Sequence, residues 1–247
     1  MDVLVVGAGE MGRWFAAAVT PDVAFADADP DRANAAAEAL GRRARAVPLD
    51  TTESFGVVCV AVPMRVATDA IAEHAGRAQQ AVVDVTGSMR DPLDAMARVA
   101  PARERVSFHP LFSADAAPGT VAVSTAASGP ATDGLRRDLE ASGNDLVDVA
   151  PEVHDDAMRT VQGRAHAAIL AFALAVSESE EAVPDALATP VYEQLSALAT
   201  RVLDGTPRVY ADIQAAFDGA EDVAATAQRL AEADLEAFED LYAEAGE

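Results

Sequence analysis

Two stretches of the sequence place polar side chains directly after runs of apolar residues. The first is Asp84-Val85-Thr86-Gly87-Ser88-Met89-Arg90, and the second is Ser107-Phe108-His109-Pro110-Leu111-Phe112. His109 follows an apolar run and precedes a proline, so we expect it at the carboxyl end of a strand. A neutral imidazole there could take a proton from a hydroxyl as a hydride leaves the same carbon, and Ser88 could hydrogen-bond either group. A lone histidine is more often structural than catalytic, so the assignment depends on what else the chain provides.

A glycine-rich run at the start of the chain indicates a nucleotide site. Gly7-Ala8-Gly9-Glu10-Met11-Gly12 lies between the apolar run Val3–Val6 and a helix-like segment. In such a turn Gly7 permits the tight bend, Gly9 lets the backbone approach a pyrophosphate, and Gly12 lets helix and strand pack closely. The helix start presents free N–H groups to phosphate oxygens. We assign to a dinucleotide site the residues Gly7, Gly9, Glu10, Met11 and Gly12. A glycine-rich turn without a ligand is the alternative.

The second expected strand ends in a carboxylate that bears on the choice of cofactor. Asp27 follows the apolar run Val23–Ala26, twenty positions after Gly7. A carboxylate there accepts hydrogen bonds from ribose hydroxyls and repels a 2′-phosphate, so NAD is favoured and NADP is the alternative. Asp29 could be the ribose ligand instead, and Arg32 could hold a 2′-phosphate.

One more loop is expected beside the cofactor. Val62-Pro63-Met64 ends the apolar run Val57–Val62 and turns into a helix. In a doubly wound sheet such a loop lies next to the bound dinucleotide, so we assign Val62 and Pro63 to its site. A simple turn explains the residues equally well. We assign no metal ligands.

The motifs lie in a pattern that changes character near residue 150. Before it, apolar runs alternate with helix-like segments, and the expected strands are residues 3–6, 23–26, 57–62, 81–85, 105–108, 121–124 and 145–149. Such alternation is typical of a mostly parallel sheet covered on both faces. We therefore predict an α/β fold in which an N-terminal Rossmann-like doubly wound sheet, residues 1–150, binds NAD.

The remaining residues, 151–247, contain no convincing strand. They are expected to form an all-α C-terminal domain with helices at 152–176, 190–203, 209–217 and 223–243, and an acidic exposed linker at 177–184. Residues 165–176 are apolar on all sides, and a helix of that kind needs neighbours on several sides. We therefore predict a substrate and dimerisation domain that forms a homodimer through its helices.

The charge of the chain excludes several classes of function. Its 247 residues carry 41 acidic and 18 basic side chains, a formal net charge of −23. Such a surface repels nucleic acid and anionic membranes. All basic residues are arginine, which excludes Schiff-base and P-loop lysine chemistry. With no apolar run of membrane-spanning length and no signal peptide before Val3, we expect a soluble, cytoplasmic protein.

The same acidity suggests a second hypothesis, about the environment of the protein. High acid content without lysine suits a protein kept soluble in concentrated salt, so we hypothesise a salt-accumulating, halophilic host. An ordinary acidic protein from a GC-rich genome is the alternative.

Five blocks of the sequence together resemble the prephenate/arogenate dehydrogenase family. They are Gly7–Gly12, Asp84–Arg90, His109–Phe112, His154–Met158 with Gln162-Gly163 and His166, and Thr200-Arg201 with Tyr210–Ile213. The blocks keep the family's order and spacing along nearly the whole chain. The resemblance implies NAD(P)-dependent oxidative decarboxylation of prephenate to 4-hydroxyphenylpyruvate, a step towards tyrosine.

The resemblance also implies a role for individual side chains. By position, His109 matches the catalytic histidine and Ser88 the serine that orients it. Arg201 matches the arginine that binds the ring carboxylate, and His166 a helical histidine near the pyruvyl side chain. We expect His154 to support the domain junction rather than take part in chemistry.

Four positions leave details open. The family often has lysine where Arg90 stands and glycine where Ser113 stands, and the second change affects the loop after the expected catalytic histidine. Arg164 or Arg208 could bind the second carboxylate of prephenate, although surface arginines that balance acidic neighbours are the more common case.

Several other functions fit parts of the sequence. Arogenate dehydrogenase is nearest, because its substrate differs only in an amino group. Another NAD(P)-dependent dehydrogenase of similar two-domain architecture is a second alternative, but β-hydroxyacid dehydrogenases use a helical lysine and pyrroline-carboxylate reductases do not explain His109 or Arg201. A non-enzymatic NAD-sensing regulatory protein would need the glycine motif without Ser88, His109 and Arg201.

Overall fold

The computed structural model describes residues 1–179 and 183–246 and divides the chain into two units, Met1–Asp155 and Asp156–Glu247. The expected boundary, between residues 150 and 151, lies five residues before this division. Part of the expected acidic linker, residues 180–182, lies outside the described residues.

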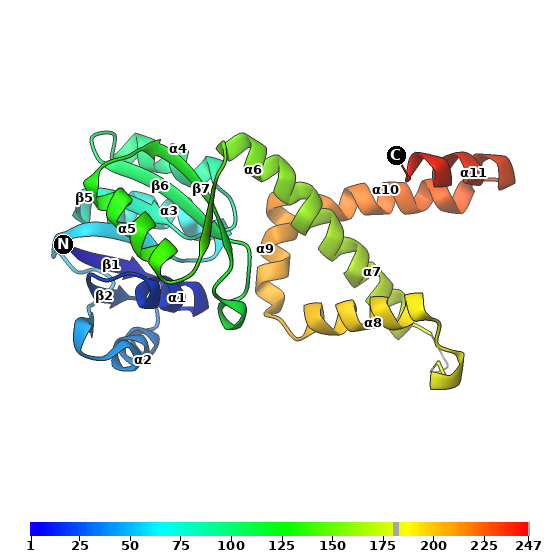
Figure 1. The fold of residues 1–247 in the computed structure, drawn as a ribbon, viewed down its shortest axis with the longest axis horizontal. Coiled ribbons are helices and arrows are strands. Elements are labelled where there is room, and N and C mark those ends of the chain that lie inside the picture. The colour runs from blue at the N-terminus through cyan, green and yellow to red at the C-terminus, as the bar shows by residue number, and fades with distance from the viewer. Residues whose placement is uncertain (180–182, 247) are drawn as a thin grey trace. The chain divides into compact units, whose positions relative to one another are not determined.

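The strands of the first unit form one sheet, in the order β3-β2-β1-β4-β5-β6-β7-β8 for the described residues. Their bounds are β1 (Asp2–Val6), β2 (Asp22–Ala26), β3 (Ala44–Ala46), β4 (Phe55–Val60), β5 (Ala78–Asp84), β6 (Glu104–Pro110), β7 (Thr120–Ala127) and β8 (Asp145–Asp148). The helices are α1 (Glu10–Ala18), α2 (Pro30–Leu40), α3 (Met64–His74), α4 (Arg90–Val99), α5 (Pro130–Ala141) and the beginning of α6 (Pro151–Met158). Figure 1 shows the helices packed around the sheet, which confirms the predicted doubly wound fold.

The apolar strands form because both faces of the sheet are buried. Successive residues of β1 point to opposite faces: Val5 packs in one apolar cluster with Phe15 of α1, and Leu4 packs in the other with Ile71 of α3. Continuous runs of valine and alanine therefore suit the central strands. Alternating polar residues would instead bury polar side chains on one face of the sheet.

The sheet is mostly parallel, as predicted, and it has two features that the sequence did not indicate. Strand β7 runs antiparallel to β6, while the strands from β3 to β6 pair in parallel. The pairing of β6 with β5 ends at Ser107, but its pairing with β7 continues to Pro110. His109 therefore lies within the strand and not after it. Strand β3 was not predicted, since its three residues contain no apolar run and pair only along one edge of β2.

The second unit is helical, as predicted. After the end of α6 come the π-helical segment Arg159–Arg164 and the helices α7 (Ala165–Ser177), α8 (Pro190–Leu203), α9 (Pro207–Phe217), α10 (Gly219–Glu232) and α11 (Leu235–Glu244). A short 3-10 turn covers Asp185–Leu187.

The helix predicted over residues 152–176 is interrupted by the π-helical segment. Two contacts accompany the interruption. The Gly163 carbonyl accepts a hydrogen bond of 2.8 Å from Gln214 Nε2. A Cβ on Gly219 would lie 2.0 Å from the Gly163 carbonyl carbon, so α10 approaches this backbone closely. A wider helical turn leaves the carbonyl available to a side chain, and sequence periodicity does not report such a local change.

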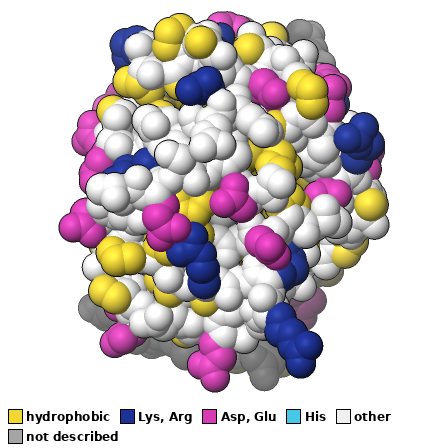
Figure 2. Space-filling view, turned by 90° about the vertical axis from the view of Figure 1, so that its left-hand side faces the viewer, with side chains coloured by type: hydrophobic (Ala, Val, Ile, Leu, Met, Phe, Trp, Pro, Cys, Tyr) yellow, Lys and Arg dark blue, Asp and Glu magenta, His cyan; other side chains and the backbone are white. Residues whose placement is uncertain are grey.

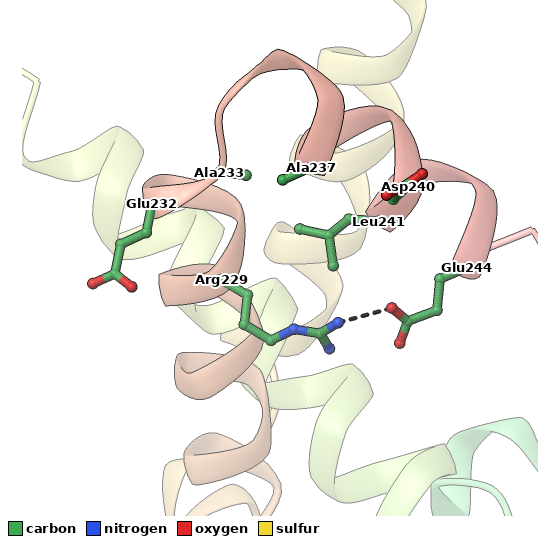
Figure 3. A pocket seen from close by; sticks show the side chains of 7 residues that line it. All are labelled: Arg229, Glu232, Ala233, Ala237, Asp240, Leu241 and Glu244. Carbon is green, nitrogen blue, oxygen red and sulfur yellow. Dashed lines mark hydrogen bonds and ion pairs between the residues drawn. The ribbon is translucent and has the colours of Figure 1, made fainter.

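The prediction of one helix over residues 223–243 was wrong. Ala233 is extended, and the carboxylate of Asp234 accepts a hydrogen bond from Ala237 N, which caps a new helix. Helix α11 folds back beside α10, and Figure 3 shows the groove between them closed at one point by the ion pair of Arg229 and Glu244 at 2.8 Å. The N-capping preference of aspartate explains the break.

The surface of the first unit is mixed in charge. On the face drawn in Figure 2, acidic side chains and arginines are dispersed among one another and do not gather into a basic patch. No helix in the described part of the chain is long and apolar enough to cross a bilayer.

Candidate active site

The turn between β1 and α1 leaves space for a phosphate. Gly7 has a φ of +102°, and a Cβ on it would lie 2.3 Å from the Ala61 carbonyl oxygen. A Cβ on Gly12 would lie 2.0 Å from the Gly7 carbonyl oxygen, whereas one on Gly9 would meet no described atom within 4 Å. The two tight positions hold the loop against its neighbours, and the open one leaves room for a pyrophosphate at the N-terminus of α1. These residues fit a nicotinamide dinucleotide.

Asp27 stands at the tip of β2, against this glycine loop. Its Oδ2 accepts a hydrogen bond of 2.7 Å from Ala8 N, and its Oδ1 accepts one of 2.9 Å from Asp29 N. Asp29 instead caps α2 by accepting a hydrogen bond from Asp31 N. Arg32 Nε lies 3.6 Å from Asp29 Oδ2. Asp27 therefore contacts the glycine loop directly, while Asp29 caps α2 and faces Arg32.

The loops after β4 and β5 approach the same edge of the sheet. A Cβ on Gly7 would lie 3.2 Å from Val62 Cγ1, so the expected Val62-Pro63 loop borders the glycine turn. Met64 follows at the start of α3, and its sulfur lies 2.8 Å from the position of a Cβ on Gly87. The carboxyl ends of parallel strands meet at one edge, which is where open α/β sheets bind ligands.

His109 lies near these loops, almost completely buried. Its side chain is 6% exposed, and its Nδ1 lies 2.8 Å from His154 Nε2. A Cβ on Gly87 would lie 3.7 Å from His109 Nε2, so the turn that carries Ser88 passes beside this nitrogen. Burial, with a smaller effect of His154, lowers the pKa of His109 to about 3. The imidazole is therefore neutral and can act as a proton acceptor.

His154 connects His109 to a carboxylate. Its Nδ1 lies 2.8 Å from Asp155 Oδ1. The same Oδ1 accepts a hydrogen bond of 2.9 Å from Met89 N, and Oδ2 accepts one of 3.1 Å from Arg90 N. Burial favours a raised pKa for Asp155, but the hydrogen bonds from His154, Met89 and Arg90 outweigh it and lower the pKa.

This connection is what reasoning from the sequence missed. We expected His154 to support the domain junction, and the structure adds a direct contact with His109. Asp155 was not singled out. A histidine followed by an aspartate was the available signal, but the two histidines are 45 positions apart in the sequence, so their contact cannot be read from it.

Ser88 is half-buried and stands in the turn between β5 and α4. Thr86 Oγ1 lies 3.1 Å from the Ser88 carbonyl oxygen and 2.5 Å from Asp84 Oδ2. Asp84 is fully buried next to Ser107, its partner in the register of β5 and β6. Burial raises the pKa of Asp84 to about 7, against hydrogen bonds from Thr86 and Ser107 that lower it. The Asp84 carboxyl group therefore supports the turn between β5 and α4 through its hydrogen bonds with Thr86.

The second unit holds the residues expected to bind substrate. The ring of His166 makes an edge-on contact of 5.0 Å with that of Tyr210, and burial lowers the pKa of His166. Its Nδ1 is buried without a hydrogen-bond partner among the described residues. Arg201 is exposed in α8 and forms no ion pair within the described part of the chain.

The two arginines considered for a second carboxylate differ in their surroundings. Arg164 Nε lies 2.9 Å from Asp222 Oδ2, and Arg159 Nε lies 3.1 Å from the same oxygen. Arg208, at the start of α9, is exposed and has no ionic partner among residues 1–179 and 183–246. The same residues contain no group of three or more side chains arranged to hold a metal ion.

A glycine cradle beside a buried neutral imidazole, on a doubly wound sheet, is the arrangement of an NAD(P)-dependent dehydrogenase. Two family models match the chain: "NADP oxidoreductase coenzyme F420-dependent" over residues 2–88, and "Prephenate dehydrogenase, dimerization domain" over residues 150–236. A 4-amino-4-deoxyprephenate dehydrogenase of Streptomyces pristinaespiralis is 32% identical over 265 aligned residues, which cover 98% of this chain and 88% of that protein. The chain belongs to the prephenate/arogenate dehydrogenase family.

Solved structures agree with this fold. A prephenate dehydrogenase of Aquifex aeolicus, in complex with hydroxyphenyl propionate and NAD⁺, superposes with a TM-score of 0.73 at 16% identity, covering 100% of this chain and 92% of that one. A Synechocystis arogenate dehydrogenase superposes with a TM-score of 0.61 at 16% identity, covering 100% and 98%.

The buried carboxyl group of Asp84 gives a stability prediction. Its pKa is 3.8 without burial and about 7 in the fold, so the folded state binds the proton more tightly. The resulting stability is complete below pH 3.8 and is lost as the pH rises through about 7. We expect Asp84→Asn to abolish this loss between pH 3.8 and about 7, which amounts to at most about 4 kcal/mol.

Urea unfolding between pH 5 and 9, at constant salt, measures this slope. Asp69→Asn, at an exposed position in α3, is the control and should keep the wild-type slope. Parallel pH profiles for wild type and Asp84→Asn would show that the carboxyl group ionises at its ordinary pH.

Proposed function

We propose that this protein is a prephenate dehydrogenase that uses NAD to convert prephenate to 4-hydroxyphenylpyruvate and CO₂. The observation that carries the proposal is His109, a neutral imidazole buried beside the turn of Ser88 and at the same sheet edge as the glycine cradle. A base in this place suits oxidation of a carbon that bears a hydroxyl group.

In the proposed reaction the ring hydroxyl of prephenate donates its hydrogen bond to His109 Nε2. A dinucleotide held by the glycine loop of Gly7, Gly9 and Gly12 would supply the acceptor for the hydride of C4. As the C4–H bond breaks, His109 draws the hydroxyl proton and so stabilises the charge that develops on the ring. The bond to the ring carboxylate then breaks, CO₂ leaves, and the electron pair makes the ring aromatic. His109 returns the proton to the phenol oxygen, and no net proton is released. Ser88 orients the imidazole.

Substrate binding requires local positive charge in an acidic protein. We assign the ring carboxylate to Arg201, whose guanidinium can make a bidentate pair. His166 lies on α7 and is assigned to the pyruvyl side chain. For the second carboxylate, the ion pairs of Arg164 and Arg159 with Asp222 favour Arg208, which has no such competitor among the described residues.

The choice of NAD over NADP rests on Asp27. Its carboxylate lies against the glycine loop, where it suits ribose hydroxyls and repels a 2′-phosphate. Arg32 is drawn towards Asp29 and is less suited to hold that phosphate.

We also propose that two copies of the chain associate through the helices of the second unit. Helix α7 contains no charged residue, yet Leu174 is 62% exposed, and in α8 Val191 and Leu203 are 68% and 61% exposed. Apolar patches of this kind mark association surfaces. The match of residues 150–236 to a dimerisation domain supports a second copy of this chain as the partner.

Other substrates are the main alternatives. Arogenate carries the same ring, and the Streptomyces relative is named for a substrate with a 4-amino group. An amino group also donates a hydrogen bond to an imidazole nitrogen, so His109 is compatible with each of them. The non-enzymatic alternative is an NAD sensor.

The decisive assay follows NADH formation with prephenate, arogenate and 4-amino-4-deoxyprephenate separately, in molar KCl. We expect turnover with prephenate, and loss of at least about 100-fold in kcat in His109→Asn, because the proton acceptor is removed while NAD still binds. His74→Asn, a histidine outside the site, is the matched control. No turnover with prephenate would refute the proposal, and a fully active His109→Asn would refute the role of the imidazole.

The cofactor preference has its own test. In Asp27→Asn we expect the ratio of kcat/KM for NADP to that for NAD to rise about tenfold, because the repulsion of the 2′-phosphate is removed. Asp22→Asn, at the exposed first residue of β2, should leave the ratio unchanged. The proposal fails if wild type already prefers NADP.

The dimer is tested by sedimentation in molar KCl. The expected mass is twice the 25.5 kDa of the chain, and Leu174→Asp should shift the equilibrium towards the monomer by placing a charge in the apolar surface. Asp94→Asn in the first unit should not. A monomeric wild-type protein at micromolar concentration would contradict the proposal.

A further inference from the structure

We propose that Asp155 is a positioning residue that sets which nitrogen of His109 accepts the substrate proton and at the same time holds the turn that carries Ser88. The inference rests on the proposed function for the role of His109 as proton acceptor. It extends that function to His154, which the sequence analysis placed outside the chemistry, and to Asp155, which the sequence analysis did not single out.

The donor and acceptor of each hydrogen bond can be assigned in turn, and Asp155 is the first group whose role is fixed. Backbone N–H groups can only donate, and Asp155 receives two of them, from Met89 at 2.9 Å and Arg90 at 3.1 Å. Each carboxylate oxygen is therefore an acceptor, and the group is ionised. The hydrogen bonds that lower the pKa of Asp155 agree with this state.

The role of Asp155 as an acceptor then fixes the proton position on His154. Its Nδ1 lies 2.8 Å from Asp155 Oδ1 and must donate, because the carboxylate accepts. His154 is 2% exposed, and removing a charged imidazole from water is unfavourable, so the proposal takes His154 as neutral. Neutral His154 thus carries its proton on Nδ1, and its Nε2 accepts.

The tautomer of His154 in turn fixes the tautomer of His109. Because His154 Nε2 accepts, His109 Nδ1, at 2.8 Å, must donate. The neutral ring then has its lone pair on Nε2, the nitrogen next to the turn of Gly87 and Ser88. Without the chain of bonds, either tautomer of a neutral imidazole would be available, and only one of them can accept a proton from this side.

The same carboxylate acts on Ser88 through the backbone. Met89 and Arg90 directly follow Ser88, and their N–H groups are held by Asp155. Thr86 contacts the Ser88 carbonyl oxygen from the preceding side. Hydrogen bonds therefore hold the turn on both sides of Ser88. In the proposal, the single carboxylate of Asp155 orients both His109 and Ser88. Such support of reacting groups by neighbouring hydrogen bonds is a general need of preorganised sites.

Two pairs of variants separate this role from simple support of the fold. Asp155→Asn offers one oxygen to three donors and turns an N–H₂ group towards at least one of them. Asp156→Asn makes the same change at the next position, which is exposed. His154→Gln keeps an acceptor that His109 Nδ1 can reach, whereas His154→Leu removes it.

We expect Asp155→Asn to lower kcat with prephenate about 100-fold or more, with KM for prephenate and the Kd of NAD changed less than about threefold. Asp156→Asn should stay within about twofold of wild type. His154→Gln should retain at least about tenfold more kcat than His154→Leu. Thermal unfolding of each variant, at the assay salt concentration, checks that the fold is present.

The second measurement needs no substrate. The chain has four histidines, so ¹⁵N spectra of the imidazoles can be assigned by substitution. We expect His109 of the wild type to be protonated on Nδ1, and this preference to weaken or reverse in Asp155→Asn but not in Asp156→Asn. Because the spectra report on the tautomer alone, they remain decisive if prephenate is not the substrate.

Two results would overturn the proposal. One is a wild-type spectrum with the proton of His109 on Nε2. The other is a folded Asp155→Asn variant whose kcat equals that of Asp156→Asn. Equal loss of kcat in His154→Gln and His154→Leu, with both folded, would show that His154 acts by packing and not by accepting a hydrogen bond.

Discussion

The hydrogen bond between His109 and His154 is the interaction on which the site depends. Burial keeps His109 neutral, but a neutral imidazole has two tautomers, and only a partner at Nδ1 can select one. That partner is in turn oriented by a carboxylate that a helix start holds in place. The base, its orientation and the turn beside it are therefore parts of one hydrogen-bonded system and not independent features.

Electrostatics imposes a second constraint. A chain with a net charge of −23 must attract an anionic cofactor and, as proposed, an anionic substrate. The α1 N-terminus provides N–H groups without a formal positive charge, and many arginines are committed elsewhere, as Arg164 is to Asp222 and Arg229 to Glu244. Arg201 and Arg208 are among the arginines that form no ion pair with a described residue, so their charge is available to an anion.

Much of the fold could be predicted because its signals are local. The apolar runs of β1 and β4 and the glycine run after β1 occur within a few residues, and their meaning follows from backbone geometry. The failures have the opposite cause. Strand β3 exists only because β2 offers it an edge, and the π-helical segment accompanies contacts that Gly163 makes with Gln214 and Gly219. Neither depends on the pattern of the segment itself.

The sequence by itself determined the class of the protein, the dinucleotide cradle and the identity of His109 as the candidate base, because a residue type in a short motif is enough for each. The tertiary structure decided which groups contact that candidate base. His109 and His154 are 45 residues apart, and Met89 and Asp155 are 66 apart. Their alignment within hydrogen-bond distance results from the register of β6 with β7 and the path of the chain into α6, and hydrogen bonds, unlike apolar patterns, depend on distances that only the folded chain sets.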